Sequence, residues 1–145
     1  MAATAEEPAA ALLDRGSGPA LLLLHGWGAH KELMAPIAER LSGYRIVAPD
    51  LPGFGATPAP PRAWGVDEYA AWLVALLDRL GVERAHVVGH SNGGRVAIAL
   101  AAAHPDRVGR LVLTDSAGIR PRRGVVHRWR VGAFKVARAV SGWPW

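Results

Sequence analysis

Residues 85–103 place the tightest constraint on what this chain can fold into. Ala85 to His90 form a compact apolar run with two adjacent valines, which is typical of a strand buried on both faces of a parallel sheet. Val96 to Ala103 are strong helix formers. Because so little chain lies between the two segments, the sequence predicts a strand, a very sharp turn at Ser91 and a helix.

The predicted turn reads Gly89-His90-Ser91-Asn92-Gly93. This is the G-x-S-x-G pattern, in which a serine is held in a strained conformation between a strand and a helix with its oxygen exposed. Side chains at positions 89 and 93 would collide with neighbouring backbone, because the strand and the helix pass close together there. Ser91 is therefore a candidate nucleophile beside helix N-terminal amides that can stabilise an oxyanion. The alternative is an ordinary glycine-rich turn that matches the pattern by chance.

Length and composition indicate one folded domain. The chain has 145 residues, of which 50% are hydrophobic, and this is enough for one buried core. It contains no cysteine, which excludes disulfides, thiolate metal sites and a cysteine nucleophile. Acids stand where a secretory signal has basic residues, and no apolar run is long enough to cross a bilayer. We therefore expect a soluble cytoplasmic protein without a membrane span.

The net charge of +5 is concentrated in the C-terminal tail. Residues 116–145 hold seven basic residues and no acid, whereas residues 1–115 hold ten basic and twelve acidic residues. Fifteen of the seventeen basic residues are arginine, which a genome-wide compositional bias can explain, and no nucleic-acid motif accompanies them. We expect a small-molecule substrate, no nucleic-acid partner, no cofactor and no metal.

Further apolar segments surround the central strand and helix. Strands are predicted at Ala20–Leu24, Tyr44–Ala48 and Arg110–Thr114, with the tail of another at Ala11–Arg15, and amphipathic helices at Lys31–Leu41 and Val66–Leu80. Gly65 is a candidate N-cap of the second helix, and we expect Asp50 to brace the Pro/Gly-rich loop that follows it. This alternation predicts an α/β fold with a doubly wound, mostly parallel sheet.

Two glycine-rich loops, residues 25–28 and 89–94, follow predicted strands at their carboxyl ends. Ligands bind beyond the carboxyl ends of strands in such sheets, where the winding direction reverses. If the two strands are neighbours, the backbone N–H groups of Trp27 and Asn92 can both face an oxyanion beside Ser91. That geometry suits acyl transfer.

These segments, in this order, resemble the alpha/beta-hydrolase superfamily, in particular its esterase-like, haloperoxidase-like and carbon-carbon bond hydrolase-like members. The resemblance rests on LLLLHGWGA at 21–29, VAPDLPGFGAT at 47–57 and VVGHSNGGRVAIALAAAHPDRVGRLVLTDSAG at 87–118. It implies that Ser91 is the nucleophile and that the N–H groups of Trp27 and Asn92 form the oxyanion hole. His25 and Gly26 would shape the first loop, and Gly89, His90 and Gly93 the second.

The resemblance also implies that this chain holds the N-terminal part of the fold. Residues 1–118 correspond to the first part of the hydrolase core, and the basic amphipathic residues 119–145 to the start of a helical cap. Members of the superfamily carry a catalytic acid and a late histidine beyond such a cap, so we expect the catalytic histidine to be absent here. Asp115 is a candidate acid, with a local turn role as the alternative, and His127 is a minor candidate for the base.

Two functions follow from these observations. The first is a serine hydrolase of a small ester-like, amide or carbon-carbon substrate; this chain alone is expected to be inactive, because a serine needs a positioned base. The second is a non-catalytic, truncated hydrolase-like module that binds a partner through its sheet edge and basic tail. Trp143 and Trp145 would favour self-association through the apolar side of that tail.

Overall fold

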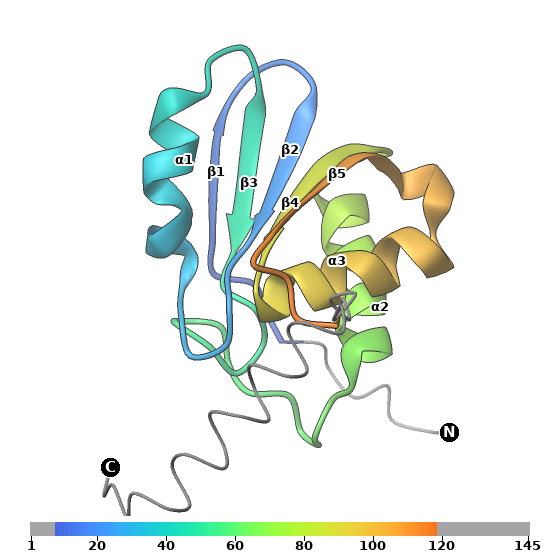
Figure 1. The fold of residues 1–145 in the computed structure, drawn as a ribbon. Helices are drawn as coiled ribbons and strands as arrows, with labels where there is room; N and C mark the ends of the chain where they lie inside the picture. The colour runs from blue at the N-terminus through green and yellow to red at the C-terminus, as the bar shows by residue number, and fades with distance from the viewer. Residues whose placement is uncertain (1–7, 119–145) are drawn as a thin grey trace, which may run out of the picture.

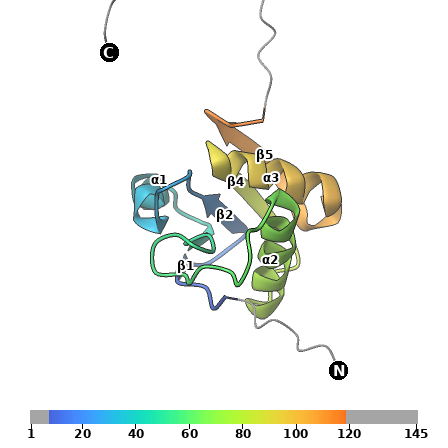
Figure 2. The ribbon, with the colours of Figure 1, turned by 90° about the horizontal axis from the view of Figure 1, so that it is seen from below.

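Five strands form a single twisted sheet in the order β1-β3-β2-β4-β5, in a computed structural model that describes residues 8–118. The elements, in chain order, are β1 (Leu12–Gly16), β2 (Ala20–Leu24), η1 (Lys31–Met34), α1 (Ala35–Arg40), β3 (Arg45–Pro49), α2 (Val66–Arg79), β4 (Ala85–His90), α3 (Asn92–Ala103), η2 (Pro105–Arg107) and β5 (Val108–Thr114). Figures 1 and 2 show α1 on one face of the sheet and α2 and α3 on the other.

The direction of winding reverses at β2. The chain passes from β2 to β3 on one side of it and later returns to β4 on the other side. Pairings β2–β3, β2–β4 and β4–β5 are parallel, and only β1 runs antiparallel, against β3. The predicted mostly parallel α/β fold is therefore confirmed, and the carboxyl ends of β2 and β4 flank the place where such sheets bind ligands.

The core lies on both faces of β2, because successive side chains of a strand point to opposite faces. Leu22 and Leu24 pack with α2 and α3, whereas Leu21 and Leu23 pack with the layer that contains α1. These four side chains are at most 6% exposed. Burial on both faces explains why this strand is a continuous apolar run instead of an alternating one.

The predicted helix over 31–41 is only partly correct. The structure has a 3-10 turn, η1, followed by a six-residue α1 with Pro36 in its first turn. Met34 and Ala38 are buried, but the apolar side chains of Leu33, Ile37 and Leu41 are 53%, 37% and 38% exposed. A 3-10 turn has about three residues per turn, so it breaks the single apolar stripe that a continuous α-helix would have presented.

The helix α2 agrees with its prediction and ends one residue earlier. Gly65 is the N-cap, and its N–H donates to Glu68 Oε2 at 2.9 Å. The side chains of Tyr69 and Trp72 fix the helix to distant chain: Tyr69 Oη donates to the Pro52 carbonyl and Trp72 Nε1 to the Pro8 carbonyl. These contacts tie α2 to the loop after β3 and to the start of the described chain.

Within residues 8–118 there is no helix with the length and apolarity that crossing a bilayer requires. The predictions for the cap segment 119–145, its self-association and the role of His127 lie outside the described residues.

Candidate active site

Ser91 occupies the bend between β4 and α3 with φ 52° and ψ −114°. Backbone at positive φ is unfavourable for a residue with a Cβ, at a cost of about 1–3 kcal/mol unless the surroundings enforce it. Here the Ser91 N–H donates to the Thr114 carbonyl at 3.1 Å, and its own carbonyl accepts from Ala117 and Arg95 N–H at 3.0 and 3.2 Å. The ends of β5 and α3 thus hold the strained residue from both sides.

Two glycines let the backbone close around this bend. A Cβ added at Gly89 would lie 2.6 Å from Gly94 Cα, and one at Gly93 would meet the carbonyl oxygens of Leu24 and His25. Neither position has room for a side chain. Gly93 therefore brings the start of α3 into direct contact with the end of β2, which is where the first glycine-rich loop begins.

The loop after β2 lies against Ser91. Leu24 pairs with Gly89 in the parallel β2–β4 register, so the two loops leave the sheet side by side. A Cβ added at Gly26 would lie 3.2 Å from Ser91 Cβ. Within residues 8–118 the backbone N–H groups of Trp27 and Asn92 donate no hydrogen bond, which leaves them available to an incoming oxygen.

His25 is fully buried and acts as a link between two loops. Its Nδ1 lies 2.8 Å from the Gly26 carbonyl, and its Nε2 accepts the Leu51 N–H at 2.9 Å. Because Nε2 accepts, the proton of the neutral ring sits on Nδ1 and is donated to Gly26. Burial lowers the pKa of His25, against a smaller opposing effect of the Gly26 hydrogen bond. With both ring nitrogens engaged, His25 is not available as a base.

His90 precedes Ser91 and is partly buried, with its Nδ1 next to the loop after β2. A Cβ added at Gly26 would lie 3.1 Å from this atom. The Nδ1 is buried and has no hydrogen-bond partner among the described residues. The structure thus places the His90 ring against Gly26 of the loop after β2.

Asp50 fastens the loop after β3. Its buried carboxylate accepts from the Lys31 N–H at 2.6 Å, Lys31 Nζ at 3.0 Å and Ala56 N–H at 2.9 Å. Burial alone would raise the pKa of Asp50, but the hydrogen bonds from Ala56 and Lys31 outweigh it and hold the pKa below its ordinary value. The bracing role of Asp50 was predicted; Lys31 was missed, since only the fold brings it to this carboxylate.

Three aromatic rings line up beside the candidate oxyanion loop. Trp27 is 74% exposed and packs edge-on against Phe54, with ring centroids 5.0 Å apart. Phe54 in turn contacts the buried His25 ring at 5.8 Å. An exposed tryptophan supported in this way provides an apolar surface at the carboxyl end of the sheet.

Asp115 lies one residue beyond the Thr114 carbonyl that binds Ser91. It has φ 49°, so the strand ends there in a turn. Its carboxylate is exposed and makes no hydrogen bond or ion pair within residues 8–118. No histidine of the described residues hydrogen-bonds to Asp115 or to Ser91, and the structure therefore does not assemble a triad from these residues.

Comparison with known proteins agrees with this architecture. The family profile of the alpha/beta hydrolase fold matches residues 19–143. The chain belongs to the alpha/beta hydrolase fold family.

Individual relatives extend well beyond the matched region. The chain is 42% identical over 115 residues to 2-hydroxymuconate semialdehyde hydrolase of Pseudomonas sp. (strain CF600), covering 74% of this chain and 40% of that one. It is 39% identical over 107 residues to Lipase 3 of Moraxella sp. (strain TA144), covering 72% and 34%. An esterase structure from Exiguobacterium antarcticum superposes with a TM-score of 0.72 at 27% identity, covering 77% and 42%. The chain spans less than half the length of these relatives.

Proposed function

We propose that the chain supplies the nucleophile and the oxyanion hole of a serine hydrolase. One observation carries the proposal: Ser91 is held at φ 52° next to Gly26, where the two glycine-rich loops meet. The Trp27 and Asn92 amides of these loops donate no hydrogen bond to the described residues, which supports their assignment to the oxyanion hole. A fold retains a strained residue of this kind only where the surroundings enforce it, and such residues cluster at active sites.

The chemistry then follows from the geometry. Ser91 Oγ attacks a substrate carbonyl carbon while a base removes the hydroxyl proton and later passes it to the leaving group. The carbonyl oxygen becomes an oxyanion that accepts hydrogen bonds from the Trp27 and Asn92 amides. The N-terminus of α3 adds a favourable dipole there. Water then hydrolyses the covalent intermediate, and the base must come from outside residues 8–118.

The apolar surface of Trp27 and Phe54 favours a small organic substrate with a hydrophobic portion next to its carbonyl group. The relatives named above comprise a semialdehyde hydrolase, a lipase and an esterase, so ester and carbon-carbon bond hydrolysis are both within the proposal.

A fluorophosphonate probe tests the role of Ser91. We expect no labelling of residues 1–145, because no histidine among residues 8–118 hydrogen-bonds to Ser91, and labelling of a version extended with the C-terminal half of a relative. The Ser91→Ala variant of the extended protein should not be labelled, whereas Ser42→Ala, on an exposed loop, should be labelled normally. A folded extended protein that stays unlabelled would contradict the proposal.

A second candidate function is a non-catalytic module that associates through its sheet edge. It is favoured by β5, which among residues 8–118 pairs only with β4 and carries Leu111 and Val112 at 36% and 51% exposure. Gel filtration and urea unfolding together distinguish between the two candidate functions. A monomer that unfolds cooperatively would count against association through this edge.

A further inference from the structure

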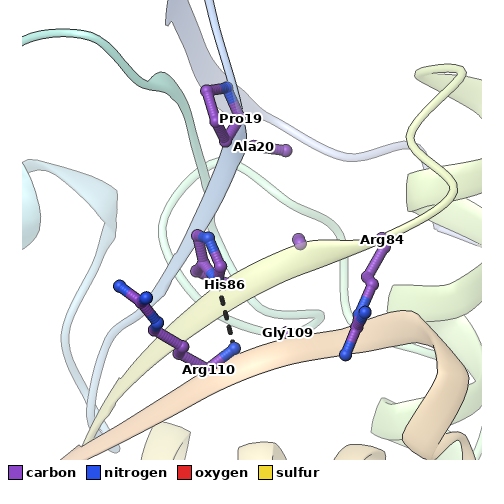
Figure 3. Close-up of a pocket in the computed structure, with 7 residues that line it drawn as sticks. Pro19, Ala20, Arg84, His86, Gly109 and Arg110 are labelled. Carbon is purple, nitrogen blue, oxygen red and sulfur yellow. Dashed lines mark hydrogen bonds between the residues drawn. The ribbon is translucent and has the colours of Figure 1, made fainter.

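A cavity of about 440 Å³ opens at the amino ends of β2, β4 and β5 (Figure 3). Ser91 follows the carboxyl end of β4, at the other end of the sheet. Pro19 and Ala20 form one wall, and residues at the starts of β4 and β5 form the rest. Its volume lies within the range of about 300–1,000 Å³ that small-molecule sites occupy. Six residues of β4 at about 3.3 Å each separate this end from the bend at Ser91.

Arg84 is fixed at the edge of the cavity. Its Nε and Nη2 both donate to the Val108 carbonyl, at 3.3 and 3.2 Å. These two bonds hold the planar guanidinium in one orientation and leave Nη1 without a hydrogen-bond partner among residues 8–118.

A bulge in the sheet positions the second group, His86. The β4–β5 register passes from Ala85↔Val108 to Val87↔Leu111, so Gly109 and Arg110 both lie opposite His86. The Arg110 N–H donates to His86 Nδ1 at 3.0 Å, and a Cβ at position 109 would lie 2.6 Å from the same atom. Since Nδ1 accepts, the neutral ring carries its proton on Nε2 and is a donor there.

The third group is the Arg110 guanidinium. Figure 3 shows Arg84 and Arg110 on either side of His86. Arg110 is exposed and makes no ion pair with any described residue, whereas neighbouring Arg107 is neutralised by Asp78 at 2.6 Å. No acidic side chain lines the cavity. Its polar side chains therefore offer donors and two positive charges but no acceptor.

We propose that this cavity binds a small phosphate ester. A phosphate monoester carries close to two negative charges at neutral pH and several acceptor oxygens, which complement the two positive charges and the N–H donors that line the cavity. A carboxylate would balance only one of the two arginines. The inference is independent of the proposed hydrolase activity, because none of its residues contacts the bend at Ser91.

Isothermal titration calorimetry on the full chain carrying Ser91→Ala tests this site without any turnover. The probes are inorganic phosphate, glycerol 3-phosphate and, as the uncharged control, glycerol. We expect both phosphates to bind and glycerol not to bind. Arg110→Gln should weaken phosphate binding at least about tenfold, as expected for loss of a charge-assisted hydrogen bond.

Arg95→Gln is the matched control, because it removes the same charge from an exposed position of α3 near the Ser91 end of the sheet. The affinity of this control for phosphate should stay within twofold of that of the chain carrying Ser91→Ala alone. Arg110→Lys keeps the charge, so it separates guanidinium geometry from net charge and should bind with intermediate affinity. Absence of phosphate binding to the folded chain, or an equal loss in Arg95→Gln and Arg110→Gln, would overturn the proposal.

Discussion

Ser91 adopts a backbone conformation that suits glycine better than serine, with φ 52° and ψ −114°. The residue is nevertheless fixed there by hydrogen bonds to Thr114, Ala117 and Arg95. The surrounding contacts therefore sustain a local cost of about 1–3 kcal/mol. Because this cost lowers the stability of the folded state, it can be measured through the free energy of unfolding, without any substrate.

Ser91→Gly should be more stable than Ser91→Ala by about 1 kcal/mol. Glycine relieves the strain at positive φ, whereas alanine keeps the Cβ that causes it, and the greater unfolded-state entropy of glycine offsets only part of the gain. Urea unfolding measures the free energy of unfolding of each variant. The control is Ala102→Gly on the exposed side of α3, which should lose about 1 kcal/mol because its backbone is helical. A Ser91→Gly variant no more stable than Ser91→Ala would show that the bend is unstrained.

His25 should remain neutral with its proton on Nδ1 at pH 6.5, as detected by the ¹⁵N chemical shifts of its ring. Burial lowers its folded pKa below the ordinary 6.5, so its contribution to stability is complete above that pH and declines as the pH falls toward the folded pKa. The stability gap between wild type and His25→Gln, about 1–3 kcal/mol at pH 7, should therefore narrow toward pH 5. A gap that widens on acidification would contradict this assignment.

At the scale of elements, Asp50 connects the loop after β3 to the start of η1 through Lys31 and Ala56. This connection holds together the chain on either side of β3. It also replaces ordinary helix capping at η1, where no side chain provides an N-cap hydrogen bond.

Asp50→Asn should lower the free energy of unfolding by about 2–4 kcal/mol at pH 7, because a buried carboxylate with three donors is lost. The folded pKa lies below the ordinary 3.8, so the stabilisation is complete above that pH and is lost as the pH falls through the folded value. Urea titrations at pH 7 and near pH 3 should thus show a smaller difference at the lower pH. Glu39→Gln, an exposed carboxyl, should change little at either pH.

How far the sequence predicts each element depends on what stabilises it. The strand–bend–helix at Ser91 and the helix over 66–80 were predictable, because local glycines, capping residues and strong periodicity all favour the observed structure. The segment 31–41 was not, because its start is set by the Asp50 carboxylate nineteen residues away. The joint role of the Trp27 and Asn92 amides was predicted only on the condition that β2 and β4 are neighbours, and the sheet order fulfils that condition.

Over the whole molecule, the two ends of the sheet differ in how far the sequence predicts them. The Ser91 end has glycine-rich motifs that carry a known geometry. The cavity at the amino ends of β2, β4 and β5 has no such motif. It depends on the β4–β5 bulge, which places Gly109 and Arg110 opposite His86. Register of this kind is set by strand pairing and not by any one segment of the sequence.

The exposed edge of the sheet should cause self-association at high concentration. In the part of the chain that the structure describes, β5 is the last strand of the sheet, contains no proline and has Val112 51% exposed, which are features of edges that pair with other chains. Val112→Lys should lower the weight-average mass in sedimentation equilibrium. Leu33→Lys replaces an apolar residue of 53% exposure on η1 and should leave the mass unchanged. Equal effects of the two variants would indicate nonspecific hydrophobic association.

The close fit of Gly93 against the end of β2 has a consequence for the order of folding. The two partners are separated by almost seventy residues, and the fit exists only after β2 and β4 have paired and α3 has docked. A free peptide of residues 85–103 has nothing to oppose relaxation at Ser91. The strained bend is therefore a product of tertiary assembly, completed late, and a partly folded chain would not yet hold Ser91 in this backbone conformation.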